Sequence, residues 1–250
     1  MDSWLWIIAT LLLLPHVAGP ILVLLTLKQA ENPTFIEVHP ESDEIPQDVV
    51  GHLVKSITAL KDDGFVLVNY YEPLGLAANV KTYLALLENR AANDLAIAVG
   101  MFSLVESNWK VQSLHVEFSN RCADDTSVCT NNSPQLMVTA TLPGRTMGLF
   151  AFIPDPRRLY QIHCALLKRH GGSKMPVPLR EGLVDYLVES VKREHRAQDQ
   201  AGYFRLSGAH YVPTLKGALI MTWKLLPPLS WHLKSKRDRE ARALLTELGV

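Results

Sequence analysis

An uncharged apolar stretch near the N-terminus, from Trp4 to Leu27, constrains the architecture of this chain more than any other part of its sequence. As an α-helix it would extend about 36 Å at 1.5 Å per residue, enough to cross a hydrocarbon core of roughly 30 Å. It therefore predicts one transmembrane helix, with the lipid bilayer as the partner of residues 4–27. Pro15 and Pro20 remove backbone donors within the stretch, so we expect a kink near its centre.

The flanks of this stretch favour an uncleaved anchor over a signal peptide. Trp4 and Trp6 lie where an interfacial aromatic belt is expected, and Lys28 lies at the other end. Asp2 makes the first residues acidic, the apolar run exceeds the roughly 7 to 15 residues of a signal-peptide core, and no small-residue cleavage site follows. Residues 1–28 are therefore interpreted as a signal-anchor, with a cleaved signal peptide as the alternative.

Charge and cysteine content indicate the side of the membrane on which the remaining chain lies. Lys28 follows the span and only Asp2 precedes it, which favours a cytoplasmic C-terminal portion. The three cysteines lack C-x-x-C spacing, so reduced thiols are expected, as is usual in the cytoplasm. We expect a single-pass membrane protein whose bulk is cytoplasmic. A Cys122–Cys129 disulfide is the alternative for a domain outside the cytoplasm.

The sequence after the anchor predicts a linker followed by an α+β domain. Three prolines and several acidic residues in residues 29–47 are typical of an extended linker. Residues 48–213 carry strand patterns first and long helical patterns later, which indicates an α+β fold. Short connections favour a mostly antiparallel meander with flanking helices.

The individual elements are predicted from hydrophobic periodicity. Strands are expected at residues 65–71, 110–121, 136–142, 147–153 and 209–212, and helices at residues 48–63, 157–169, 178–200 and 215–226. Residues 77–88 fit either a helix or the first strand of a hairpin that continues to residue 102, and the hairpin is preferred. The charged run at residues 192–196 predicts a solvated helix face, in which Glu189 pairs with Arg193 one turn later.

The segment 214–250 is predicted to be helical, apolar at first and basic later. Thr214 can cap an apolar helix that ends before Pro227 and is too short for a second span. Two placements are open for this helix: the core of the domain, or a bilayer surface with Trp223 and Trp231 at the headgroups. A basic cluster that suits an anionic lipid surface follows it, formed by Lys234, Lys236, Arg237, Arg239 and Arg242.

Candidate functional residues come from strand patterning, because the standard catalytic and nucleotide-binding motifs do not occur in the sequence. His115 and Glu117 share one face of the strand predicted at residues 110–121, and Asp124 and Asp125 follow at its end. Such residues can form a general acid, a general base or a hard-cation site. The alternative is a solvated outer face of the sheet that ends in a polar turn. The sequence predicts no cofactor and no metal site.

A formal net charge of zero provides no positive field for nucleic acid, so no nucleic-acid partner is expected. The sequence thus predicts a membrane-anchored interaction or assembly module that faces the cytoplasm and binds a protein partner. The alternative is a membrane-bound enzyme that acts on a lipid or envelope metabolite, with its site on the His115/Glu117 strand face. These hypotheses differ in whether His115 and Glu117 line a closed pocket or face open water.

Overall fold

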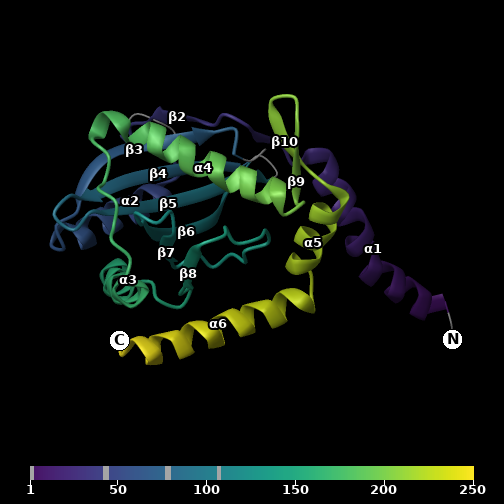
Figure 1. Ribbon diagram of the computed structural model, residues 1–250. Coiled ribbons are helices and arrows are strands. Elements are labelled where there is room, and N and C mark those ends of the chain that lie inside the picture. The colour runs from purple at the N-terminus through teal and green to yellow at the C-terminus, as the bar shows by residue number, and fades with distance from the viewer. Residues whose placement is uncertain (1–2, 42–44, 77–79, 106–107) are drawn as a thin grey trace.

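A mixed β-sheet with helices on both faces forms the centre of the computed structural model, which describes residues 3–41, 45–76, 80–105 and 108–250 (Figure 1). Side chains are described except at residues 3, 5–12, 104–105 and 108–109. The sheet has the order β2-β3-β4-β5-β6-β7-β8, and all neighbours are antiparallel except β7 and β8. The strands are β2 (Thr34–Glu37), β3 (Val66–Leu74), β4 (Val80–Asn89), β5 (Asp94–Val105), β6 (Asn108–Arg121), β7 (Ser127–Asn131) and β8 (Arg145–Leu149).

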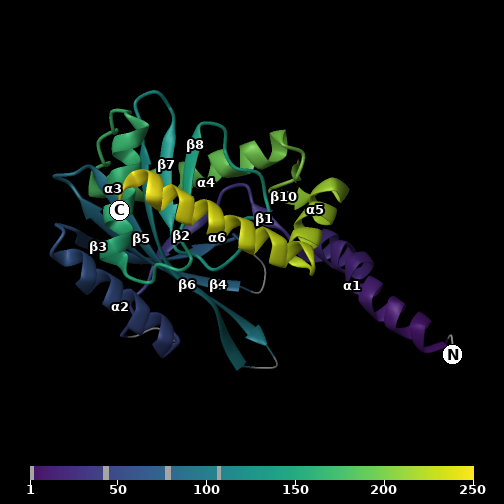
Figure 2. The same ribbon diagram turned by 90° about the horizontal axis from the view of Figure 1, so that it is seen from below.

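The two faces of this sheet are covered by different helices (Figures 1 and 2). On one face lie α2 (Gln47–Lys61) and α3 (Pro156–His170), and α6 (Leu229–Leu248) packs alongside α3 and β8. On the other face lie the short helix η1 (Arg180–Gly182) and α4 (Leu183–Gln200). The α+β class predicted from the sequence is confirmed.

Alternation along β6 divides its side chains between the two layers. Val116 and Phe118 are fully buried in the core beneath α2 and α3. The residues between and after them, Glu117, Ser119 and Arg121, line a cavity beside α4. Because successive side chains of a strand point to opposite faces, a single strand supplies both the apolar core and a polar surface beneath α4.

Close packing of α2 on the sheet depends on a glycine in β5. A Cβ atom at Gly100 would collide with the side chain of Val49, which is itself fully buried. Since protein cores tolerate little overpacking, the absence of a side chain at this position lets the helix approach the strand.

The predicted transmembrane helix is wrong: in the part of the chain that the structure describes, no helix is both long and apolar enough to cross a bilayer. The signal-anchor, single-pass and membrane-localisation predictions that depended on it are wrong with it. The stretch instead forms α1 (Ser3–Thr26), whose C-terminal half packs against α5 (Leu215–Leu225). There Gly19 lies against Thr222, and the indole Nε1 of Trp223 donates to the carbonyl oxygen of His16 at 3.2 Å.

Apolar residues that the sequence assigned to the bilayer thus contact the chain itself. Val23 and Leu27 pack against a small cluster formed by Phe204, Tyr211 and Met221. That cluster involves a second sheet of order β1-β10-β9, with β1 (Gln29–Ala30), β9 (Phe204–Ser207) and β10 (His210–Pro213). The segment predicted as a linker therefore contributes β1 to this sheet and β2 to the large one.

The tryptophans and the lysine predicted at a membrane interface occupy several environments. Trp4 is 73% exposed, Trp231 is 66% exposed, and Lys28 is exposed. Trp223 is 45% exposed, with its indole nitrogen bonded to α1. The side chain of Trp6 lies outside the described residues.

Most other predicted elements are confirmed, including the hairpin of β4 and β5, the long strand β6, and helices α2, α3, α4 and α5. The strand predicted at residues 136–142 is wrong, since this segment has no regular structure. The next predicted strand begins earlier, at Arg145, and pairs in parallel with β7, so the sheet is mixed. The three cysteines are free, which excludes the alternative Cys122–Cys129 disulfide in this structure.

Candidate functional site

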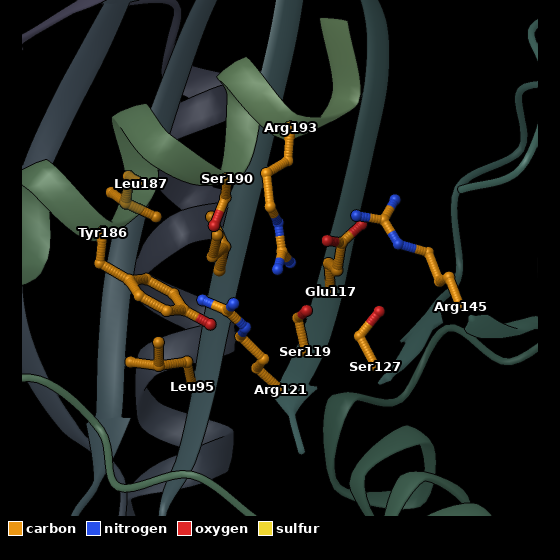
Figure 3. Close-up of a pocket in the computed structure, with 11 residues that line it drawn as sticks. Leu95, Glu117, Ser119, Arg121, Ser127, Arg145, Tyr186, Leu187, Ser190 and Arg193 are labelled. Carbon is orange, nitrogen blue, oxygen red and sulfur yellow. The ribbon is translucent and has the colours of Figure 1, made fainter. Parts of the chain in front are cut away.

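Three arginines from separate elements line a cavity of about 90 Å³ between α4 and the sheet (Figure 3). Arg121 ends β6, Arg145 begins β8, and Arg193 projects from α4. We call this cavity the arginine pocket. Its lining consists of Leu95, Ile97, Glu117, Ser119, Arg121, Ser127, Arg145, Tyr186, Leu187, Ser190 and Arg193. Its volume is several times the roughly 10–15 Å³ that one water molecule needs.

Hydroxyl groups surround the arginines. Ser119, Ser127, Ser190 and Tyr186 line the pocket, and within the described residues none of their hydroxyls has a hydrogen-bond partner. Burial raises the pKa of Tyr186, and the three neighbouring guanidinium groups lower it in part. The four hydroxyls are therefore neutral donors at the edge of a positively charged cavity.

Arg121 and Arg145 are only partly engaged by carboxylates. Arg121 pairs with the exposed Asp125, and Arg145 Nη1 donates to Glu194 Oε2 at 2.9 Å. The Nε–H groups of both arginines are buried and have no hydrogen-bond partner in the described structure. Because a buried unsatisfied donor costs free energy, two such donors in residues that line the same cavity require an explanation.

Arg193 has no ion pair among the residues that the structure describes. The predicted pair with Glu189 is wrong, since Glu189 bonds Arg196 instead. The prediction of a solvated face at residues 192–196 is also only partly right, because His195 is buried and Arg193 lines the pocket. In Figure 3 the guanidinium group of Arg193 points from α4 toward the sheet.

Glu117 is the one acidic residue in the lining of the arginine pocket. Burial raises the pKa of its carboxyl group, and the charge of Arg145 and a hydrogen bond from Asn131 Nδ2 at 3.3 Å oppose this shift. The nearby carboxylate of Glu194 raises it further. The charge of the pocket therefore depends on the protonation state of Glu117.

A second, larger cavity of about 480 Å³ adjoins the first beneath α4, and we call it the apolar cavity. The two cavities share five lining residues: Ile97, Glu117, Arg145, Leu187 and Ser190. Most of the other residues around the apolar cavity are hydrophobic, namely Phe35, Pro73, Leu76, Leu84, Val99, Met101 and Val191. The space beneath α4 is thus polar and basic at one end and apolar at the other.

Of the candidate residues predicted from the sequence, His115 and Glu117 are brought together and Asp124 and Asp125 are not. His115 and Glu117 both line the apolar cavity. The Ser113 hydroxyl lies 2.9 Å from His115 Nδ1, and burial lowers the pKa of His115 to about 4. Asp124 and Asp125 are exposed in the turn after β6, where Asp124 accepts hydrogen bonds from Thr126.

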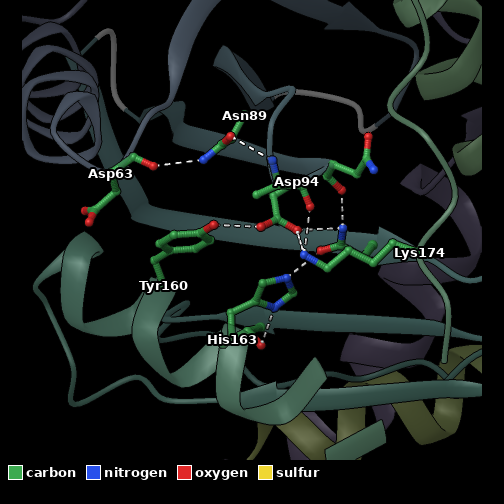
Figure 4. A network of polar contacts seen from close by, with 10 residues as sticks. Asp63, Asn89, Asp94, Tyr160, His163 and Lys174 are labelled. Atoms are coloured by element: carbon green, nitrogen blue, oxygen red, sulfur yellow. Dashed lines mark hydrogen bonds and ion pairs between the residues drawn. The ribbon is translucent and has the colours of Figure 1, made fainter. Parts of the chain in front are cut away.

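A separate polar network lies on the opposite side of the sheet, beneath α3 (Figure 4). The buried carboxylate of Asp94 accepts hydrogen bonds from Tyr160 at 2.7 Å, Lys174 at 2.6 Å and Asn120 at 2.8 Å. His163 Nε2 lies 2.6 Å from Asn120 Oδ1, and its Nδ1 lies 2.9 Å from the Thr130 hydroxyl. Every polar group of this network has a partner, which is what a structural network requires.

Sequence reasoning missed the arginine pocket because its three arginines come from three elements with no motif spacing. Arg121 did carry a signal, since it follows His115 and Glu117 in the same alternation along β6. Arg193 lies within a charged run that was interpreted as a solvated helix face. Arg145 is the first residue of β8, but the sequence predicted that this strand begins only at residue 147.

Comparison of the chain with protein-family models, with curated protein sequences and with solved structures found no match. In the described residues, no group of three or more histidine, cysteine or acidic side chains is arranged to hold a metal ion. Function is therefore inferred from the arginine pocket and the apolar cavity.

Proposed function

We propose that this chain is a ligand-binding module that recognises an oxyanion, a carboxylate or a phosphate-like group, in the arginine pocket. The observation that carries the proposal is the convergence of donors without partners. Three arginines and four hydroxyl-bearing residues line one cavity, and the Nε–H groups of Arg121 and Arg145 are buried without hydrogen-bond partners in the described structure. Arginine is the side chain best suited to such ligands, because its planar fork of donors matches the oxygens of a carboxylate or phosphate.

Charge supports the same choice of ligand. Three guanidinium groups and one carboxyl group line the pocket, while Asp125 and Glu194 offset part of the positive charge from its edges. An anion would complete the hydrogen bonding of the buried donors, whereas a cation would meet repulsion from the arginines. A neutral apolar ligand would leave those donors unsatisfied at a cost.

The interaction module and the enzyme predicted from the sequence both remain candidates, but without the membrane anchor. Ligand binding is a form of the predicted interaction module, without the membrane anchor. An enzyme acting at the His115/Glu117 face is the second candidate, favoured by the fact that both residues line a cavity beneath α4. The low pKa of His115 keeps its ring neutral near pH 7, which suits a base more than an acid.

The anionic lipid surface predicted for the C-terminal basic cluster and the predicted protein partner also stay predictions. Arg237 donates to the carbonyl oxygens of Pro134 and Gln135, and Arg242 lies over the ring of Phe152. Lys236 lies 3.7 Å from Glu240 on its own helix. Lys234 and Arg239 are exposed. These contacts engage part of the basic cluster within the chain, so the arginine pocket is the better supported site.

Titration calorimetry with sulfate, phosphate and acetate tests the proposal. Arg193→Ala should weaken binding of the best of these anions by about 10- to 100-fold, since a hydrogen bond to a charged group contributes roughly 1.5–3 kcal/mol. Lys192→Ala is the matched control, because it removes one positive charge from the neighbouring position of α4 outside the pocket lining. Thermal unfolding checks that both variants are folded. Failure of the unmodified protein to bind any of the three anions, or equal binding by Arg193→Ala, would contradict the proposal.

A further inference from the structure

The arginine pocket and the apolar cavity are neighbours beneath α4. Five residues line both, and they include the charged Glu117 and Arg145 and the hydrophobic Ile97 and Leu187. The boundary between the two cavities therefore lies beneath α4 at Leu187 and Ser190, which line both. A ligand whose anionic group lies among the arginines would have the apolar cavity directly beside it.

The size and lining of the apolar cavity suit a hydrophobic chain. Its volume of about 480 Å³ lies within the roughly 300–1,000 Å³ typical of small-molecule sites, which are lined mostly by apolar side chains. Leu84 and Val99 form part of its floor on the sheet, and Leu187 and Val191 of α4 form part of its roof. Burying an alkyl chain between these walls would be favourable, since each buried methylene contributes about 0.8 kcal/mol.

Resting on the proposed function, we infer that the ligand is a single-chain anionic amphiphile. Its carboxylate or phosphate head group lies among Arg121, Arg145 and Arg193, and its alkyl tail lies in the apolar cavity beneath α4. The charge of one cavity and the apolar lining of the next together favour this occupant. A small hydrophilic anion would leave the apolar cavity unused, and an uncharged lipid would leave the buried guanidinium donors without acceptors.

A chain-length series measures the contribution of the tail. Acetate, octanoate, decanoate and dodecanoate are titrated below their micelle-forming concentrations, with dodecyl phosphate as the phosphate-headed probe and dodecyl maltoside as the uncharged one. Affinity should rise by two- to fourfold for each added methylene, fourfold being the full 0.8 kcal/mol. Comparison of dodecanoate with dodecyl phosphate identifies the preferred head group. The maltoside should bind at least tenfold more weakly than the better anion.

Variants that fill the apolar cavity test where the tail lies. Val191→Trp on α4 and Thr82→Trp on β4 each place a large ring in the cavity from opposite walls, so one remains informative if the other fails to fold. Each should weaken dodecanoate binding by at least tenfold while leaving sulfate binding within about twofold of the unmodified protein. Lys192→Trp is the matched control, since it adds the same ring one position along α4, outside both cavity linings.

The outcomes separate this inference from the proposed function. If sulfate or acetate binds in an Arg193-dependent manner but affinity does not change with chain length, the inference is wrong and the proposed function stands. If dodecanoate binds equally to Arg193→Ala and to the unmodified protein, the head-group assignment and with it the inference are wrong, and the proposed function fails as well if sulfate binding is equally unaffected. Equal loss of dodecanoate affinity in Lys192→Trp and Val191→Trp would also overturn the inference.

Discussion

The two polar clusters on opposite sides of β6 differ in how completely their hydrogen bonds are made. Beneath α3, Asp94 and its neighbours form a network in which each polar group has a partner. Beneath α4, three arginines line one cavity, and the buried Nε–H groups of Arg121 and Arg145 have no acceptor in the described structure. Asn120 belongs to the first cluster, and the adjacent Arg121 belongs to the second. Burial of polar groups is therefore a poor guide to function by itself, whereas buried donors that lack acceptors point to a ligand.

The largest predicted effect is a loss of stability when the Asp94 network beneath α3 is broken. Asp94→Ala removes the acceptor of Tyr160, Lys174 and Asn120 and leaves a partly buried ammonium group unpaired. We expect the free energy of unfolding to fall by about 3–5 kcal/mol, the usual cost of breaking a buried ion pair by removing one partner. Urea unfolding followed by circular dichroism measures this change.

Two control variants are compared with Asp94→Ala in the same unfolding experiment. Glu247→Ala removes an exposed ion pair with Arg169 and should cost no more than about 1 kcal/mol. Arg193→Ala should leave the free energy of unfolding unchanged or raise it slightly, because it relieves repulsion among three guanidinium groups. A cost for Arg193→Ala as large as that for Asp94→Ala would remove the distinction between the two clusters.

A smaller effect is expected on sulfate affinity, which should depend on the protonation state of Glu117. Burial raises the pKa of Glu117, so its carboxyl group becomes charged only as the pH rises through a value above the ordinary 4.3 or so. The charged form repels an anion in the pocket, and sulfate binding should therefore weaken as the pH rises across this range. Glu117→Gln should remove this pH dependence, and it should strengthen sulfate binding by about threefold to tenfold at a pH at which the Glu117 carboxyl group of the unmodified protein is charged.

Neither His115 nor Cys129, which both lie near Glu117, obscures this test. The pKa of His115 is lowered to about 4, so its ring stays neutral above that pH, and burial raises the pKa of the Cys129 thiol. Glu181→Gln, at an exposed position in η1, is the control for a general change in charge. An unchanged pH profile in Glu117→Gln would show that Glu117 does not control anion affinity.

The sequence predicted the fold more completely than it predicted the site, because periodicity is local and the pocket is not. Alternation placed His115 and Glu117 on one face of β6, which is correct. The same pattern contains Ser119 and Arg121, but nothing local shows that α4 covers this face and brings Arg193 to it. Convergence of distant elements depends on packing that one strand or helix does not encode.

The prediction that α1 crosses a membrane was wrong for a similar reason, since it rested on a local property of the sequence. Hydropathy measures how apolar a segment is, but it does not distinguish contacts with lipid from contacts within the chain. The side chains of Val23 and Leu27 pack against the cluster around Met221, and Gly19 permits close approach of α5 at Thr222. These contacts join residues far apart in the sequence, so hydropathy alone does not predict them.

The central claim, that the donors beneath α4 form an anion site while the network beneath α3 is structural, is tested most directly by nuclear magnetic resonance of arginine Nε–H groups. On titration with phosphate, the Nε–H signals of Arg121, Arg145 and Arg193 should shift in a saturable manner with one common affinity. The ring signals of His163 should stay unchanged, because its partners Asn120 and Thr130 are already in place. Absence of a saturable shift at the three pocket arginines, or an equal shift at the exposed Arg157, would contradict the claim.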